Sequence, residues 1–227
     1  IYCVSTLVGD IYLAFLNKQH LNALFLDIHS AFPSVHLPTL WQTLCELHLP
    51  KHFSSYILNL MSPQTFIFPH PNLALLSRTN YIGLPQGSTL SPILFNIYVC
   101  SLLKMNSNAS LISFADDLVL YHSDQDIHSS TRTITEALQL LQTELDRLHL
   151  QLSLPKCITV IFSLRPYNLG QALIYHQEQQ IPLRTHHLYL GINLDYKLLW
   201  TQHIDMLRTK CSHAMYLPQA LSSTQWG

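Results

Sequence analysis

The chain has 227 residues, of which 48% are hydrophobic and only 11% are charged, and its formal net charge is −1. A chain of this length can bury a sizeable core, in one large domain or two small ones. Soluble domains usually carry ~25% charged residues, so the low value predicts that part of the surface is covered by something outside this segment. The net charge argues against a strong phosphate-binding surface within the chain, although residues 131–227, with eight basic and six acidic side chains, are mildly basic.

Neither a membrane span nor a secretory signal is predicted. The longest apolar stretch, residues 90–103, covers 14 residues and is interrupted by Pro92 and Asn96, whereas a transmembrane helix needs ~20. No basic segment with a cleavage site opens the chain, and both ends read as cuts from a longer polyprotein. The five cysteines lie 42 to 57 residues apart, too far for a zinc knuckle, so reduced thiols are expected.

The first half of the chain predicts strands that alternate with helices. The apolar run over residues 23–28 predicts a buried strand that ends near Asp27. Residues 37–60, which open at Pro38, predict a helix. Residues 62–82 contain three prolines among apolar residues and predict short strands with turns.

The second half begins with Ser91-Pro92, which predicts an N-cap and a helix that continues to about Lys104. Residues 111–121 predict a β-hairpin with two carboxylates at its turn. Apolar residues at alternating spacings of four and three predict a helix over residues 134–148, opened by a capping box from Thr133 to Glu136. Strands are expected at 157–163 and 187–194 and an amphipathic helix at 201–221, an order that favours an α+β fold.

Three carboxylates, Asp27, Asp116 and Asp117, are embedded in apolar strands. A buried carboxylate is costly unless it is paired or bound to a cation, and two adjacent ones need a compensating positive charge. Mg²⁺ prefers oxygen ligands, and two such ions about 3.5–4 Å apart can support an in-line displacement by a 3′-hydroxyl. Because successive strand residues face opposite sides, both members of the pair can approach ions only from a tight turn. For Asp27 alone, a turn or a buried ion pair remains the alternative.

Five segments in this order resemble the reverse transcriptase of non-LTR (LINE-type, jockey-like) retrotransposons. They are residues 25–32 (FLDIHSAF), 83–96 (GLPQGS followed by LSPILFN), 114–117 (FADD), 152–157 (LSLPKC) and 189–204 (YLG, then LD and WTQHI). Two departures from the family pattern are Ser153 at a usual Asn and Pro33 at a common Asp. The resemblance extends over nearly the whole chain.

The resemblance implies a polymerase right-hand palm, a small antiparallel sheet with an Asp-Asp hairpin backed by helices, with partial fingers and a helical thumb stub. Residues 1–20 would be residual fingers, and residues 21–192 the palm, with interleaved fingers elements at about 37–82. Residues 193–227 would start the thumb. The remaining fingers, thumb and endonuclease regions of the parent polyprotein would be missing, so the isolated segment is expected to be inactive.

The resemblance also assigns a metal site. Asp27 and Asp116 would be the principal ligands of two Mg²⁺ ions, for which Mn²⁺ can substitute. Asp117 and the backbone carbonyl of Ile28 would complete the site. Lys156 would stand near the leaving pyrophosphate as a general acid, and a solvated surface lysine is the alternative interpretation.

Nucleotide and primer contacts follow from the same resemblance. Phe32 and the adjacent Ala31 would lie under the incoming sugar, where the ring excludes a ribose 2′-hydroxyl. Gln86 and Gly87 would contact the incoming nucleotide and template. The alternatives are a core phenylalanine and an ordinary turn. The remaining segment would form part of the primer grip, namely Tyr189, Leu190 and Gly191.

The implied function is RNA-directed DNA polymerisation, with an RNA template, a DNA primer and dNTPs as partners and no membrane. Such a protein would be intracellular, acting on chromosomal DNA in the nucleus and assembling with RNA in the cytoplasm. A viral RNA-dependent RNA polymerase is one alternative, although its hairpin more often reads Gly-Asp-Asp. The other is a degenerate or repurposed relic that binds nucleic acid or protein without catalysis, which the near-neutral charge and Pro33 favour.

Overall fold

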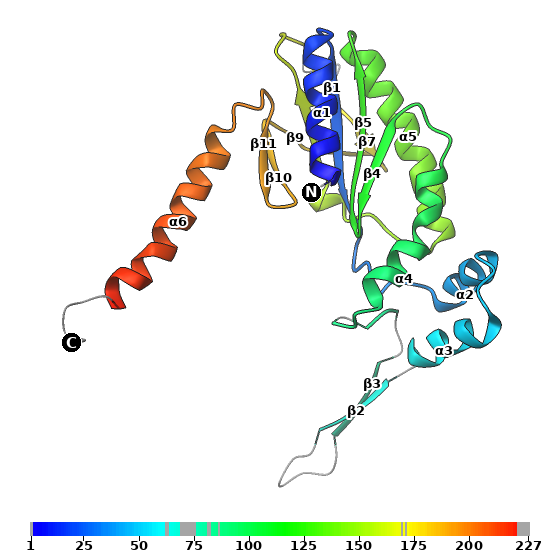
Figure 1. Cartoon of the computed structure of the whole chain (residues 1–227). Coiled ribbons are helices and arrows are strands. Elements are labelled where there is room, and N and C mark those ends of the chain that lie inside the picture. Colours follow the sequence, from blue (N-terminus) through cyan, green and yellow to red (C-terminus); the bar gives the residue numbers. More distant parts are fainter. Residues whose placement is uncertain are drawn as a thin grey trace. The chain divides into compact units, whose positions relative to one another are not determined.

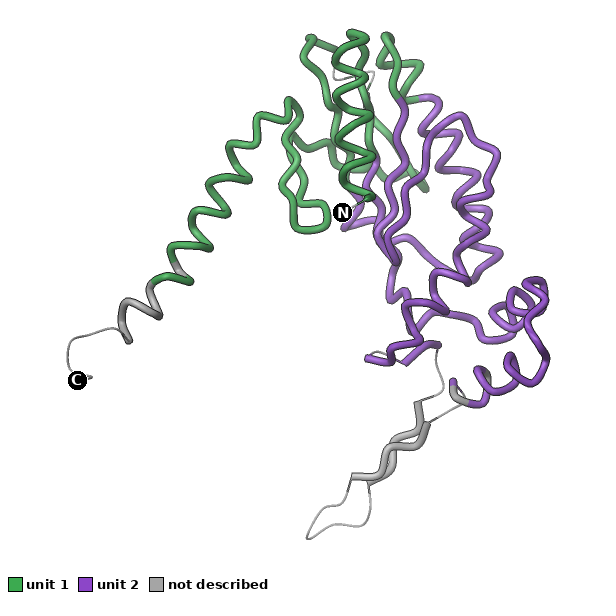
Figure 2. The backbone as a smooth tube through the Cα atoms, in the orientation of Figure 1, with its two compact units in different colours: residues 1–23, 123–131, 158–227 green, residues 24–122, 132–157 purple. Residues whose placement is uncertain are grey.

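The computed structural model describes residues 2–61, 64–68, 76–80, 83–85, 87–168, 170 and 172–221. The chain forms two compact units (Figure 2), one of residues 1–23, 123–131 and 158–227 and the other of residues 24–122 and 132–157. These units are defined by packing, so the boundaries of fingers, palm and thumb stay a prediction. The division passes through strand β1 (His20–Asp27) and helix α5 (Ile127–Arg147).

The main sheet has five strands in the order β4-β5-β1-β6-β9. Strand β4 (Ser110–Phe114) pairs antiparallel with β5 (Asp117–Asp124). Strand β6 (Ile158–Phe162) pairs in parallel with the short β9 (Leu183–Arg184). The mixture of helices with a largely antiparallel sheet confirms the predicted α+β class.

The second unit carries the helices between β1 and β4. Helix α2 (Leu37–Glu46) packs against α3 (Lys51–Met61) and against α4 (Ser91–Tyr98) (Figure 1). Strands β2 (Gln64–Phe68) and β3 (Leu76–Asn80) form an antiparallel hairpin, as the prolines of this region predicted. A 3₁₀ turn, Cys100–Lys104, continues the path of α4.

The first unit opens with helix α1 (Tyr2–Leu16). Its other elements are β7 (Tyr175–His176), β8 (Gln179–Gln180), β10 (His186–Tyr189), β11 (Ile192–Asp195) and α6 (Thr201–Leu221). Strands β10 and β11 form an antiparallel hairpin, and α6 contacts β11 (Figure 1). The helix predicted at 201–221 is confirmed.

Two predicted helix starts are wrong. Helix α5 begins at Ile127, so Thr133 lies inside it and forms no capping box. The amides of His128 and Ser129 instead donate to the carboxylate of Asp126, at 3.1 and 3.2 Å. The N-cap of α4 is Leu90, and the Ser91 hydroxyl donates to the carbonyl of Pro85 at 2.6 Å instead of capping the helix.

The predicted helix over residues 37–60 is two helices. Helix α2 ends at Glu46 and α3 begins at Lys51. Between them His48 has a φ of 55°, a conformation that helical residues do not adopt, and Pro50 lacks an amide hydrogen to continue a helix. The hydrophobic period alone did not detect this break.

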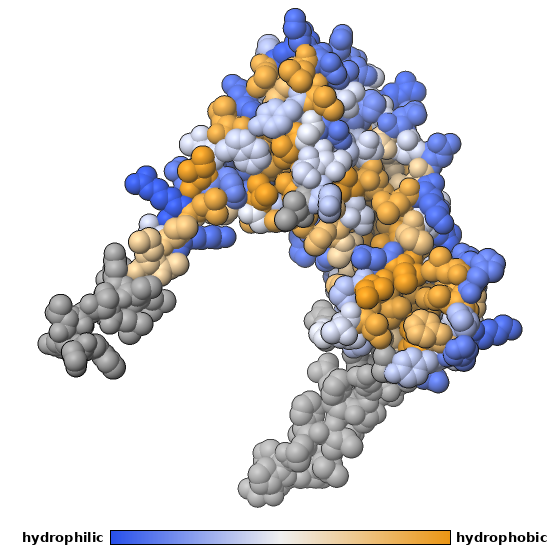
Figure 3. All heavy atoms as spheres, in the orientation of Figure 1, coloured by the Kyte–Doolittle hydropathy of each residue, from blue (hydrophilic) through white to orange (hydrophobic). Residues whose placement is uncertain are grey.

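Apolar side chains are exposed over α2 and α3 (Figure 3). Leu47, Phe53 and Tyr56 are all exposed on or beside these helices. Exposed aromatic residues on adjacent helices explain part of the low charged fraction of the sequence.

Among the described helices, none is both long enough and apolar enough to cross a membrane.

Candidate active site

The Asp-Asp pair lies at the turn of the β4–β5 hairpin. Phe114, the last residue of β4, pairs with Asp117, the first residue of β5, so the connection consists of Ala115 and Asp116 alone. Ala115 has a φ of 53°, which L-residues with a side chain adopt only where the surroundings enforce it. This two-residue turn brings both carboxylates to the same end of the hairpin, as the sequence predicted.

Asp27 is the last residue of β1, and the segment that follows helix α5 fixes its backbone. The amide of Ser153 donates to the carbonyl of Asp27 at 2.8 Å, and the amide of His29 donates to the carbonyl of Gln151 at 2.8 Å. Between these bonds Ile28 and Leu152 form an antiparallel bridge. The backbone carbonyl predicted as a metal ligand therefore belongs to a residue held on both sides.

The same segment brings Lys156 to the carboxylates. Its Nζ lies 3.0 Å from Oδ2 of Asp27, a contact between residues 129 positions apart in the chain. The hydrogen bond and the charge of Asp27 raise the pKa of Lys156. Two residues that the sequence assigned to one site thus form a direct ion pair.

Electrostatic coupling joins the three aspartates. Burial first, and then the negative charges of Asp116 and Asp27, raise the pKa of Asp117, while the charge of Lys156 lowers it. Asp117 is half-buried at the base of the hairpin turn. A neighbourhood that raises the pKa of a carboxylate through like charges is one in which a cation is stabilising.

The carboxylates fit divalent ions by chemistry, although they do not enclose one. Within the described part of the chain, no three His, Cys, Asp or Glu side chains are gathered closely enough to hold an ion by themselves. Asp27 and Asp116 supply hard oxygen donors, and Mg²⁺ keeps several waters and takes substrate phosphates in place of a complete protein cage. The donor set therefore suits Mg²⁺ that is shared with a substrate.

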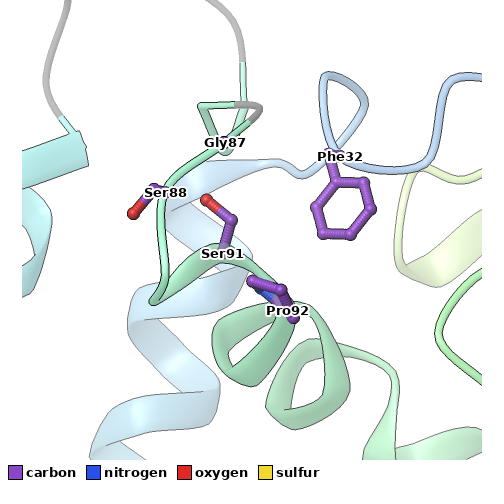
Figure 4. A pocket seen from close by; sticks show the side chains of 5 residues that line it. All are labelled: Phe32, Gly87, Ser88, Ser91 and Pro92. Carbon is purple, nitrogen blue, oxygen red and sulfur yellow. The ribbon is translucent and has the colours of Figure 1, made fainter. Parts of the chain in front are cut away.

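A cavity of about 320 Å³ lies between the segment after β1 and the start of α4 (Figure 4). Phe32 faces Ser91 and Pro92 across it, and Gly87 and Ser88 complete the lining. The ring of Phe32 also lies 5.1 Å, centroid to centroid, from that of Phe95. Phe32 and Gly87, which the resemblance assigned to nucleotide contacts, thus border one cavity.

The resemblance assigned five other residues to nucleotide and primer contacts. Ala31 is buried beside Phe32 in the sequence, and Gln86 lies outside the described residues. In the first unit, Tyr189 is buried and pairs with Ile192, so Leu190 and Gly191 form the turn of the β10–β11 hairpin. Their φ values of 47° and 83° suit a tight hairpin turn. The primer-grip assignment stays a prediction.

Tyr98 joins elements around this site, and the sequence did not predict this role. The hydroxyl of Tyr98 donates to the carbonyl of Leu148 and accepts the amide of His36 at 3.3 Å, which ties α4 to the end of α5 and to the start of α2. Tyr98 is fully buried within an apolar run. Nothing in that run distinguishes it from a core residue, so only the fold reveals its role.

Comparison with known proteins gives the class of this site. The family model described as reverse transcriptase (RNA-dependent DNA polymerase) matches residues 5–205. The chain therefore belongs to the reverse transcriptase family. Enzymes of this family use divalent metal ions, in agreement with the oxygen donors of Asp27 and Asp116.

Curated relatives include RNA-directed DNA polymerases from two mobile elements of Drosophila melanogaster. The chain is 26% identical to the probable RNA-directed DNA polymerase from transposon BS, over 93% of this chain and 24% of that protein. It is 26% identical to the RNA-directed DNA polymerase from mobile element jockey, over 88% of this chain and 23% of that protein. The chain thus spans about a quarter of the length of these relatives.

Among solved structures, the fold is similar to that of telomerase. The apo telomerase of Candida tropicalis matches with a TM-score of 0.59 and 10% identity, over 86% of this chain and 35% of that one. A C-terminally truncated form of apo telomerase from the same organism gives a TM-score of 0.57 and 12% identity, over 86% and 38%. These matches establish a right-hand polymerase fold.

Proposed function

We propose that this chain is the catalytic core of a retrotransposon RNA-directed DNA polymerase that transfers dNMP to a primer 3′-hydroxyl with two Mg²⁺ ions. The observation that carries the proposal is that one compact unit holds the Asp27–Lys156 ion pair, 3.0 Å from Nζ to Oδ2, and the Asp116-Asp117 hairpin turn, whose charges act on each other. Membership of the reverse transcriptase family supports it. RNA template, DNA primer and dNTPs are the proposed partners.

In this proposal the aspartates would bind the metal ions that contact the primer 3′-hydroxyl and the nucleotide phosphates. Bound ions would activate the 3′-hydroxyl and neutralise charge that develops on the leaving pyrophosphate. Asp27 and Asp116 would hold them, and Asp117 and the Ile28 carbonyl would complete the ligands. Lys156, freed from its ion pair with Asp27, would donate a proton or a hydrogen bond to the pyrophosphate.

The cavity beside Phe32 would receive the sugar of the incoming nucleotide. Its volume of about 320 Å³ suits part of a nucleotide, and the Phe32 ring forms one side of it. A ring at this position leaves no room for a 2′-hydroxyl, which would select dNTPs over rNTPs. Gln86 and Gly87 would contact the nucleotide and template, and residues 189–191 the primer.

The element's life cycle sets the proposed location. The chain would act in the nucleus when it polymerises on chromosomal DNA and would assemble with the template RNA in the cytoplasm. Both compartments are intracellular. The cytoplasm is reducing, which suits the five free cysteines.

The test is incorporation of dTTP on poly(rA) primed with oligo(dT). A polypeptide that adds the flanking regions of the parent protein should incorporate dTTP with Mg²⁺, and Asp116→Asn should reduce the rate by at least about 100-fold. Asp205→Asn, on the exposed face of α6, is the matched control and should retain the rate. Equal rates in the two variants would reject the catalytic assignment of Asp116.

The isolated 227-residue chain is expected to incorporate little or no dTTP in the same assay. Its net charge is near neutral, so it has few basic side chains in excess to hold a triphosphate and a template. Robust synthesis by this chain alone would contradict the assignment of these functions to regions outside it.

The second candidate function is a non-catalytic relic that binds nucleic acid or protein. The exposed apolar surface over α2 and α3 and the near-neutral charge favour it. A relic would leave both the extended polypeptide and its Asp116→Asn variant inactive while the protein remained folded.

A further inference from the structure

The backbone of Phe32 rests on the loop that precedes α4. The amide of Leu84 donates to the carbonyl of Phe32 at 2.8 Å. Gly83, its neighbour, is buried and has a φ of 59°. A Cβ added at Gly83 would lie deep inside the van der Waals radii of the carbonyl oxygens of Phe32 and Pro33. The two backbone segments approach each other at a distance that only glycine permits.

This close approach distinguishes Gly83 from the other glycines with positive φ. Gly87 and Gly191 have φ values of 89° and 83°, yet a Cβ at either position would meet nothing within 4 Å. Their backbone conformation alone explains the glycine. At Gly83 both the conformation and the space require it, and the atoms that a side chain would displace belong to Phe32 and Pro33.

The ring of Phe32 has a second support. Phe95 is fully buried in α4 and lies 5.1 Å from Phe32, at an interplanar angle of 40°. The backbone is therefore fixed by Gly83 and Leu84, and the ring by Phe95. These supports determine how far the ring extends along the wall of the 320 Å³ cavity.

We propose that Gly83 is a positioning residue for sugar selection, because its missing side chain lets the Leu84 amide hold Phe32 at the height where the ring excludes a ribose 2′-hydroxyl. The inference rests on the proposed function of Phe32. Any side chain at position 83 pushes the Phe32–Pro33 backbone out of its place and moves the ring off Phe95. Small displacements of a group that contacts the substrate change discrimination strongly.

The test measures incorporation rates for dTTP and UTP in the polypeptide that includes the flanking regions. Gly83→Ala should lower the dTTP/UTP ratio by at least about fivefold. In a Phe32→Val background the same substitution should leave the ratio unchanged, because the ring through which Gly83 acts is absent. Gly9→Ala is the control, since Gly9 lies in α1 and a Cβ there meets nothing within 4 Å.

A second variant separates positioning from misfolding. Replacing the amide of Leu84 by an ester, through incorporation of the α-hydroxy acid, removes the donor to Phe32 without adding an atom to the crowded side of Gly83. The ester should also lower the dTTP/UTP ratio, and it decides the question if Gly83→Ala does not fold. Circular dichroism reports folding in each variant.

The outcomes distinguish this inference from the proposed function. If Phe32→Val relaxes selection while folded Gly83→Ala and the ester slow both nucleotides equally, Gly83 has only a structural role and the inference is wrong. If Phe32→Val leaves the ratio unchanged, the sugar-selecting role of Phe32 fails and the inference fails with it. A fall in the ratio that persists in the Phe32→Val background would show that Gly83 acts by another route.

Discussion

The surroundings of Asp117 destabilise the ionised form of its side chain. Burial, and then Asp116 and Asp27, raise its pKa from the ordinary 3.8. The folded state therefore binds this proton more tightly than the unfolded state does. The contribution of Asp117 to the free energy of unfolding falls as the pH rises from 3.8 through the raised pKa, and it stays at its lowest value at neutral pH.

Asp117→Asn removes this penalty, so the metal-free variant should melt at a higher temperature at pH 7. Because the side chain is half-buried, solvent screens the repulsion and the gain should be about 1–2 °C. The difference should shrink as the pH approaches 3.8, where the aspartate itself becomes protonated. Melting curves across this range check it, and a variant that is less stable at pH 7 would show that no like-charge repulsion acts.

Phe32→Val tests sugar selection at the residue that the family resemblance singled out. If the ring lies under the incoming sugar, its loss opens the volume of a 2′-hydroxyl, and the ratio of dTTP to UTP incorporation should fall by at least about tenfold. If Phe32 served only to pack against Phe95, the variant would lose roughly 1–3 kcal/mol of stability and slow both nucleotides equally. Single-turnover rates with each nucleotide separate the two results.

Among single residues, the sequence predicted those that carry the chemistry better than those that position them. Asp27, Asp116 and Asp117 are recognisable because carboxylates inside apolar strands are rare and costly. Gly83 belonged to a recognised motif, but its contact with the Phe32 carbonyl joins residues 51 positions apart, and no local pattern encodes that contact.

Among the elements, the passage from β11 to α6 depends on one side chain. The carboxylate of Asp195 accepts the backbone amides of Lys197, Leu199 and Trp200, at 3.1, 3.1 and 2.9 Å. Leu198 and Trp200 have φ values of 52° and 64°, so this turn relies on hydrogen bonds to hold an unfavourable backbone. Asp195 thus sets where α6 begins.

Asp195→Ala should loosen this turn at a cost of about 1–2 kcal/mol, as the loss of a helix cap does. Hydrogen exchange should accelerate at the amides of Lys197, Leu199 and Trp200 and remain unchanged in β6. Asp205→Ala, four residues into α6, is the matched control. Unchanged protection of the three amides would show that the turn persists without the carboxylate.

Element boundaries depended on competition for hydrogen bonds. The two apolar arms around the acidic pair predicted the β4–β5 hairpin, and the helix predicted over residues 201–221 is α6. Capping signals misplaced the starts of α4 and α5, because Ser91 donates to the Pro85 carbonyl and Asp126 accepts the first amides of α5. The hydrophobic period joined α2 to α3 because both present the same apolar period across the break at His48.

For the whole molecule, the sequence predicted the α+β fold class and the order of the segments. Only the structure shows which contacts bring the site residues together. Asp27, the hairpin pair and Lys156 come from three parts of the second unit, joined by the pairing of residues 27–29 with 151–153. Such long-range pairing follows from sheet topology, which a single sequence specifies only weakly. The family resemblance predicted this assembly where hydrophobic periodicity could not, because its five segments together imply one arrangement of the palm.

The central claim is that Asp27 and Asp116 hold divalent ions, and Mn²⁺ binding to the 227-residue chain, followed by electron paramagnetic resonance, tests it most directly. If these carboxylates are the principal oxygen donors, Asp116→Asn should weaken Mn²⁺ binding by at least about tenfold. Asp205→Asn should bind as the unchanged chain does. Superimposable binding curves for the unchanged chain and Asp116→Asn would contradict the metal site and, with it, the proposed chemistry.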